Sequence, residues 1–285
     1  MHQASHVDVE QPPILLASDV DGTFWSPGLP MGALCEAYDH RPPEVEVLFA
    51  SSRSVEELAF LTRALHADGD FIAENGAVAV THDEDVAWHL PGARRALIGD
   101  RRAYVAVWGD ESASVRRAVL AARARHRAPV RLLEELEPEM RKRLVGDDDD
   151  MRRACSRRAS VLVHAERGAA LEPWIRALRR SGYHVESGGR WLAVWRGAGK
   201  GQALSHYLRA RSLAGRAPAV VAAIGDGEND VSLLQSAELR FAVPRPDGTV
   251  HPALRVLGHV CIASHDGTAG WCQVVSSLGG QPCRS

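Results

Sequence analysis

Short apolar runs alternate with amphipathic helical segments along this chain, and three of the runs stop abruptly at polar clusters. The runs ILLAS (14–18), EVEVLFA (44–50) and AVVAAIG (219–225) each have the length and composition of a buried strand. Buried strands that alternate with helices are typical of a largely parallel sheet with helices on both faces. We therefore expect a doubly wound α/β core.

The polar clusters directly follow these three runs. They are DVDGT (19–23), SSRS (51–54) and GDGEND (225–230). In open α/β sheets, ligands bind beyond the carboxyl ends of the strands. We therefore expect the three clusters to meet at one edge of the sheet and to form the functional site there.

Composition excludes several other classes of protein. The chain has 285 residues, 45% hydrophobic and 25% charged, with a formal net charge of −2, so it has no global attraction for nucleic acid or anionic membranes. Five widely spaced cysteines without a C-x-x-C pair argue against a disulfide framework and a structural zinc site. No signal-peptide pattern or membrane-length apolar run is present, and we expect a cytoplasmic protein.

Paired carboxylates at a strand end favour a hard cation. Asp19 and Asp21 are two residues apart, so in an extended segment their side chains share a face. Asp226 and Asp230 come from the second acidic cluster, and Asn229 adds an amide oxygen. Mg²⁺ prefers a few carboxylates together with water and phosphate oxygens. A single Asp at such a position is more often a cap or turn residue, but two clusters at matching strand ends predict a magnesium site.

Four motifs in fixed order resemble those of the haloacid-dehalogenase (HAD) type phosphohydrolases. They are DVDGT, FASSRS, the lysine of GKGQAL, and GDGEND. The resemblance implies a HAD-like, Rossmannoid core with an α/β cap inserted between the second and third motifs, as in the type IIB subclass of sugar-phosphate phosphatases. The implied division is a first core part at 1–82, a cap at 83–196 that closes over the site, and a second core part at 197–285.

The same resemblance implies roles for individual residues. Asp19 corresponds to the nucleophile that forms an aspartyl-phosphate, and Asp21 to the general acid and base. Ser51, Lys200 and Asn229 correspond to residues that hold the phosphoryl oxygens. Mg²⁺ is expected on the Asp19 carboxylate, the Asp21 backbone carbonyl and the second acidic cluster.

Finer features resemble the mannosyl-3-phosphoglycerate phosphatases, on the segments ASSRS, FIAENGA and VESGGRW. Arginines suit the carboxylate of a phosphoglycerate, although GGR is equally an ordinary hairpin turn. The segment CSRRAS (155–160) departs from the family pattern, so Arg157 and Arg158 either contact a more anionic substrate or form solvated helix surface. The substrate-binding residues that we predict are Ser52, Arg53, Glu74, Asn75, Gly188, Gly189 and Arg190.

The resulting hypothesis is a Mg²⁺-dependent phosphatase that acts on a glycosyl phosphoglycerate or a related sugar phosphate, as a monomer or homodimer without nucleic-acid or membrane partners. Three alternatives stay open at this point. They are a phosphatase of another sugar phosphate, a sugar phosphomutase that uses the same aspartyl-phosphate, and a non-catalytic binding protein with the same fold.

Overall fold

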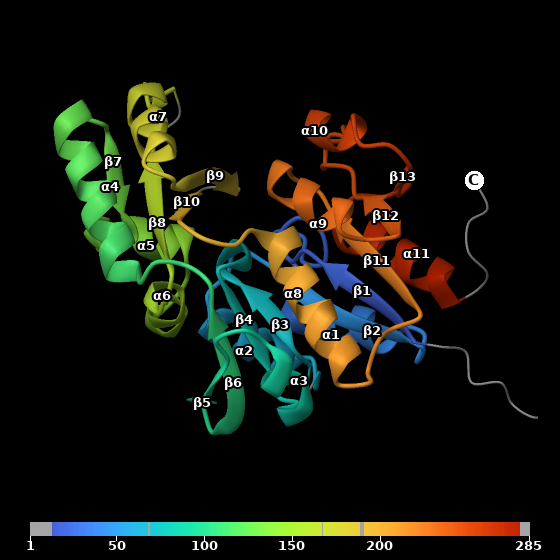
Figure 1. Ribbon diagram of the computed structural model, residues 1–285. Coiled ribbons are helices and arrows are strands. Elements are labelled where there is room, and N and C mark those ends of the chain that lie inside the picture. The colour runs from blue at the N-terminus through green and yellow to red at the C-terminus, as the bar shows by residue number, and fades with distance from the viewer. Residues whose placement is uncertain (1–12, 68, 167, 189–190, 280–285) are drawn as a thin grey trace, which may run out of the picture.

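A computed structural model describes residues 13–67, 69–166, 168–188 and 191–279 (Figure 1). Within these residues the strands form one nine-stranded sheet and one four-stranded sheet. Gly189 and Arg190, two of the predicted substrate-binding residues, lie outside the described residues.

The large sheet is parallel over its first six strands in spatial order and antiparallel over its last three. Because β1 and its neighbours are parallel, their carboxyl ends lie at one edge. The doubly wound α/β prediction is confirmed. In spatial order the strands are β13 (Val260–Ile262), β12 (Leu239–Ala242), β11 (Val220–Gly225), β1 (Ile14–Ser18), β2 (Val45–Ala50), β3 (Phe71–Ala73), β4 (Val78–Thr81), β6 (Arg101–Val107) and β5 (Arg94–Ile98).

Helices cover both faces of this sheet because successive residues of its strands are apolar and point to opposite faces. Leu16 packs into the core under one group of helices, while Leu15 and Ala17 pack under the other group. The first group is α1 (Met31–Asp39), α2 (Val55–Ala64) and α11 (Gly267–Gly279). The second group is α3 (Glu84–His89), α8 (Lys200–Leu213), α9 (Val231–Gln235) and α10 (Pro252–Arg255). A capping box of Ser54 and Glu57 starts α2.

The four-stranded sheet belongs to a second unit that stands beside the large sheet (Figure 1). Its strands, in spatial order, are β7 (Val130–Leu132), β8 (Ser160–Ala165), β10 (Trp191–Trp195) and β9 (His184–Gly188). Helices α4 (Ser112–His126) and α7 (Glu172–Arg180) pack on it around a core of their own. Two further helices, α5 (Pro138–Leu144) and α6 (Asp148–Cys155), and a 3₁₀ turn, η2 (Leu133–Glu135), complete this unit.

The second unit starts later in the chain than the sequence indicated. The predicted cap began at residue 83, but β6 pairs with β4 and β5 pairs with β6, so residues 94–107 extend the large sheet. The apolar pattern of AYVAVW (103–108) predicts a strand but does not identify its partner, so the sequence did not assign this strand to the large sheet. An isolated bridge between Gly109 and Gly197 joins the two connecting segments. We therefore place the insert, as a proposal, between these two glycines.

The insert packs against the core through a few apolar side chains. Ala154, Ala159 and Trp195 of the insert belong to the same buried cluster as Phe49 and Leu58 of the core. The insert therefore rests on the face of the large sheet that carries α2.

Candidate active site

Three polar clusters meet at the carboxyl ends of adjacent strands, as the sequence predicted. Asp19 follows β1, Ser51 follows β2 and Asp226 follows β11, and β1 pairs in parallel with both of the other strands. The edge position follows from strand order alone, because parallel neighbours end on the same side of a sheet.

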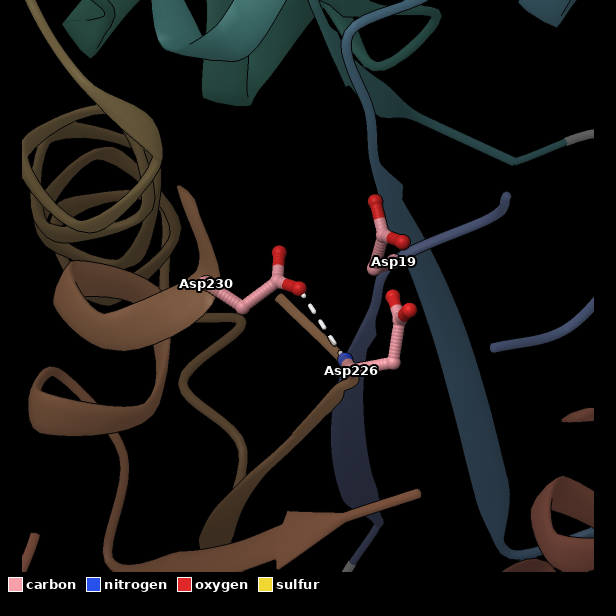
Figure 2. A group of neighbouring side chains, drawn as sticks. All are labelled: Asp19, Asp226 and Asp230. Carbon is pink, nitrogen blue, oxygen red and sulfur yellow. Dashed lines mark hydrogen bonds between the residues drawn. The ribbon is translucent and has the colours of Figure 1, made fainter. Parts of the chain in front are cut away.

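Three carboxylates gather at this edge. One oxygen from each of Asp19, Asp226 and Asp230 lies within 4.8 Å of the other two. Figure 2 shows the Asp19 and Asp226 carboxylates side by side at their strand ends, with Asp230 reaching toward them from the 3₁₀ turn η3 (Glu228–Asp230). Asp19 and Asp230 are buried, while Asp226 is partly open to solvent.

Lys200 lies between two of these carboxylates. Its Nζ is 2.6 Å from Oδ1 of Asp19 and 2.7 Å from Oδ1 of Asp230, and its side chain is 1% exposed. Lys200 is the first residue of α8, and that helix start lies directly against Gly76. A Cβ on Gly76 would be 2.2 Å from the carbonyl carbon of Gly199, so the close approach requires glycine.

Asp230 contributes a negative charge to the site and also fixes the backbone of the Asp226–Gly227 loop. Its Oδ2 accepts hydrogen bonds from the backbone N–H of Asp226, at 3.1 Å, and of Gly227, at 3.0 Å. Its Oδ1 accepts from Lys200. Both oxygens are therefore engaged by the protein, which leaves Asp19 and Asp226 as the carboxylates with free coordination capacity.

The cluster carries more negative charge than Lys200 alone neutralises. Burial and the neighbouring Asp230 carboxylate raise the pKa of Asp19 well above its usual range, against the opposing effect of Lys200. The same two causes raise the pKa of Asp226 to about 7. Burial would lower the pKa of Lys200, but the carboxylates of Asp19 and Asp230 raise it, so the amine stays protonated.

This donor set fits a magnesium ion. Three carboxylates face a single ammonium group, so one divalent cation would balance the two remaining negative charges. All available donors are oxygens, and Mg²⁺ prefers such a set completed by water. Thr23 fixes one side of the site, because its Oγ1 donates to Oδ1 of Asp226 at 3.3 Å.

Asp21 stands apart from the acidic cluster and pairs with Arg53. The Arg53 guanidinium binds it in a bidentate manner, with Nη2 2.6 Å from Oδ1 and Nε 3.0 Å from Oδ2. The guanidinium also lies over the Trp25 ring, 4.4 Å from its centroid. Half of the Asp21 side chain, 53%, is exposed, so it can reach a ligand above the cluster. The Asp21 carboxylate is not one of the three carboxylates that gather at the candidate metal site.

The other predicted phosphate-binding residues, and two of the predicted substrate-binding residues, lie around the same edge. Ser51 is fully buried, and its Oγ accepts from the Arg53 N–H at 3.3 Å. Ser52 and Asn229 are both partly exposed, in the loops that follow β2 and β11. Asn75 donates its backbone N–H to the Ser51 carbonyl at 2.9 Å, and its own buried Oδ1 accepts no hydrogen bond from the described residues.

Glu74 has partners that the sequence did not predict. Its buried carboxylate accepts from the Arg158 and Ala159 backbone N–H groups, at 2.7 and 3.0 Å, and from the Ser160 hydroxyl at 2.6 Å. Both oxygens are thus bound by the insert, so the expected contact with sugar hydroxyls has no support in this geometry. Gly188 is the last residue of β9 in the insert, and the rest of the GGR segment lies outside the described residues.

The CSRRAS segment also differs from both readings of the sequence. Arg157 is buried, with 6% of its side chain exposed, and it binds the Ser52 carbonyl of the core at 2.9 Å. Arg158 pairs with Glu56 on α2 at 3.2 Å. Arg157 therefore faces the core, and the partly exposed Arg158 side chain is paired with a residue of the core.

One acidic residue near the site was missed by the sequence reasoning. Glu186 on β9 is half-buried, and its carboxylate is close enough to Lys200 and Asp230 to interact with both electrostatically. Burial raises the pKa of Glu186 to about 7. The sequence pattern offered no reason to place Glu186 in the site, because only the packing of the insert on the core brings β9 next to η3.

Comparison with known proteins supports the same fold. Residues 183–255 match the family model of the haloacid dehalogenase-like hydrolases. No curated protein sequence matches the chain. The residues that match the family model include the end of the insert, Lys200 and the GDGEND cluster.

Solved structures are similar over nearly the whole chain. A phosphatase of the haloalkanoate enzyme superfamily from Bacteroides thetaiotaomicron has 19% identity and a TM-score of 0.60, over 96% of this chain and 97% of that one. The sucrose-phosphatase of Synechocystis sp. PCC6803, solved with sucrose and phosphate, has 14% identity and a TM-score of 0.56, over 94% and 98%. A HAD subclass IIB sugar phosphatase has 16% identity and a TM-score of 0.58, over 94% and 99%.

These likenesses show that the chain has the HAD-type fold, a mixed α/β core with an additional antiparallel sheet. None of the helices in the part of the chain that the structure describes is long and apolar enough to span a bilayer.

Proposed function

We propose that this protein is a Mg²⁺-dependent phosphatase that hydrolyses the phosphomonoester of a sugar phosphate or glycosyl phosphoglycerate through an aspartyl-phosphate. The observation that carries the proposal is the buried Asp19 carboxylate, held by Lys200 and adjoining the Asp226 carboxylate. The Lys200 ammonium favours the ionised form of Asp19 and fixes its position, and a bound Mg²⁺ would favour the ionised form further, as a nucleophile requires.

In the first step, an Asp19 oxygen attacks phosphorus and the ester P–O bond breaks. The departing alcohol oxygen takes a proton from the Asp21 carboxyl group, which Arg53 holds in place. In the second step, water attacks the phosphorus of the aspartyl-phosphate and passes a proton to the Asp21 carboxylate. Inorganic phosphate leaves, and Asp19 is again a free carboxylate.

The remaining residues are proposed to hold Mg²⁺ or the phosphoryl oxygens. Asp19, Asp226 and the Asp21 carbonyl would hold Mg²⁺, with Asp230 keeping the Asp226 loop in position. The bound ion would neutralise charge on the phosphoryl oxygens, the main requirement of phosphoryl transfer. Lys200, Ser51 and Asn229 are proposed to hold those oxygens in a fixed orientation.

The substrate class rests on the insert and on the structural neighbours. Two of the similar proteins are named as sugar phosphatases, one of them solved with sucrose and phosphate. Glu186 brings a carboxyl group from the insert toward the site, and carboxyl groups bind sugar hydroxyls well. Because the Arg53 guanidinium already pairs with Asp21, recognition of a glycerate carboxylate would depend on other groups, such as Arg190.

The test is phosphate release with and without Mg²⁺ across glycosyl-3-phosphoglycerates, hexose phosphates and 3-phosphoglycerate. Mg²⁺-dependent release that stops in EDTA supports the proposal, and the preferred compound identifies the substrate class. Conversion to an isomeric sugar phosphate without free phosphate would replace the phosphatase by a mutase. No reaction with any compound would favour a binding protein.

A further inference from the structure

Arg157 of the insert is bound to the loop that follows β2 of the core. Its guanidinium donates to the Ser52 carbonyl at 2.9 Å and to the Ser160 hydroxyl at 3.0 Å. A third bond ties it to the Ala154 carbonyl at 3.0 Å, and Glu57 accepts at 3.5 Å. A buried cation with this many partners holds its acceptors in one arrangement.

The neighbouring carbonyl of the same loop is also fixed by the insert, through Glu74. The Glu74 N–H donates to the Arg53 carbonyl at 2.9 Å. The Glu74 carboxylate is in turn held by the N–H groups of Arg158 and Ala159 and by the Ser160 hydroxyl. The insert therefore constrains the backbone on both sides of Arg53.

Arg53 transmits this constraint to the site. Its guanidinium makes the bidentate contact with Asp21 and packs over Trp25. Asp21 is half exposed, and the bidentate contact with Arg53 helps to orient its carboxylate. A shift of the loop at Ser52 would move the guanidinium and thus the carboxylate.

We propose that Arg157 is a positioning residue for Asp21: by fixing the Ser52–Arg53 backbone, the seated insert aligns the carboxyl group that protonates the departing alcohol. This inference rests on the proposed function, in which Asp21 is the acid. On this proposal, Arg157 of CSRRAS, the segment that departs from the family pattern, acts in catalysis and does not recognise a charged group of the substrate.

The insert does not depend on Arg157 alone for its attachment. The Ser54 hydroxyl donates to the Arg153 carbonyl at 2.7 Å, and Ala159 and Trp195 share the core's buried cluster. An Arg157 variant should therefore keep the insert in place while loosening the loop. The positioning role and a merely structural role then predict different kinetics.

The test compares two substrates in the Arg157→Met variant. Hexose 6-phosphate releases a basic alkoxide that needs a proton, whereas p-nitrophenyl phosphate releases a stable phenolate that does not. Because kcat/KM reports on steps up to alcohol departure, we expect a fall of about 10²-fold with the hexose phosphate and under about 10-fold with the aryl phosphate. Arg157→Lys, which keeps the charge, should restore part of the loss.

Arg158→Gln is the matched control. It removes the ion pair with Glu56 but leaves the backbone bond to Glu74, so both substrates should change equally and little. An equal fall for both substrates in Arg157→Met, or the same selectivity in Arg158→Gln, would overturn the inference.

A second readout does not depend on activity. The Nε–H resonance of Arg53, assigned by its loss in Arg53→Lys, should be protected from exchange in the wild type and lose protection in Arg157→Met and, less so, in Arg157→Lys. Unchanged protection in both variants would overturn the inference. Lack of phosphate release by the wild-type protein would instead defeat the proposed function, and the resonance would still decide the coupling.

Discussion

The Lys200 ammonium group lies 2.6 Å from the Asp19 carboxylate, and both side chains are almost completely buried. The same ammonium is 2.7 Å from Asp230. A single cation thus holds together a residue from the start of the chain and one from its second core part. This contact joins Asp19, which we propose as the nucleophile, to the start of α8 and to the GDGEND loop.

Loss of Lys200 should destabilise the protein because it leaves two buried carboxylates unpaired. We expect Lys200→Met to lower the free energy of unfolding by about 3–5 kcal/mol in EDTA, as for other broken buried ion pairs. Mg²⁺ should restore part of this loss by replacing the missing positive charge. Urea unfolding with and without Mg²⁺ measures both effects. Adding Asp230→Asn should recover stability, and a double variant as unstable as the sum of the single ones would contradict the account.

Asp21 should matter most where the leaving group is basic. In Asp21→Asn, kcat/KM for an alkyl phosphate should fall by about 10²–10⁴-fold, the range for a lost general acid. For p-nitrophenyl phosphate the fall should be much smaller. Steady-state assays on both compounds give the comparison. Equal losses would show that Asp21 does not protonate the alcohol.

Gly76 should be required for both stability and activity. Its φ of +103° disfavours any side chain, and a Cβ would collide with Gly199 at the start of α8. Gly76→Ala should therefore pay about 1–3 kcal/mol in backbone strain, increased by the collision, and should displace Lys200. Gly92→Ala is the control, because Gly92 has a φ of +75° but nothing near its Cβ position. If both variants lose only stability, and to the same extent, the packing argument is wrong.

Asp70 should stabilise the core in a pH-dependent way. Burial alone would raise its pKa, but hydrogen bonds from His82, Thr81 and Tyr207 lower it below the ordinary value. A lowered folded-state pKa contributes stability above the unfolded-state pKa of about 3.9 and loses it as the pH falls through the folded-state value.

We therefore expect Asp70→Asn to cost about 1–3 kcal/mol at pH 7 and to converge with the wild type in acid. Denaturant unfolding across pH gives the two curves, with Asp39→Asn as an exposed control. A difference between Asp70→Asn and wild type that stays constant down to acid pH would rule out the ionised carboxylate as its source.

Local signals predicted the fold and the acidic cluster well. Strand β1 could be read from its apolar run, and the positions of Asp19 and Asp226 followed from the end of each parallel strand. The pairing of β5 and β6 with the large sheet could not be read, because a strand pattern does not identify its partner. The sequence therefore predicted an earlier start of the insert than the one that we propose.

Contacts between the insert and the core were equally inaccessible to sequence reasoning. Glu74 was predicted to bind sugar, yet its carboxylate binds the backbone of Arg158 and Ala159, some 80 positions away. Arg157 was predicted to face substrate or solvent, yet it binds the Ser52 carbonyl. Both sets of contacts depend on how the insert packs against the core, and no local sequence pattern predicts that packing.

The most direct test of the account is to trap the phosphoryl group on Asp19. Asp21→Asn should form the aspartyl-phosphate from p-nitrophenyl phosphate and Mg²⁺ but hydrolyse it slowly, giving a burst of one p-nitrophenol per enzyme. After an acid quench, mass spectrometry should find one phosphoryl group on the peptide that contains Asp19, and none in Asp19→Asn/Asp21→Asn. A phosphoryl group on another residue, or substantial phosphate release by Asp19→Asn alone, would contradict the central claim.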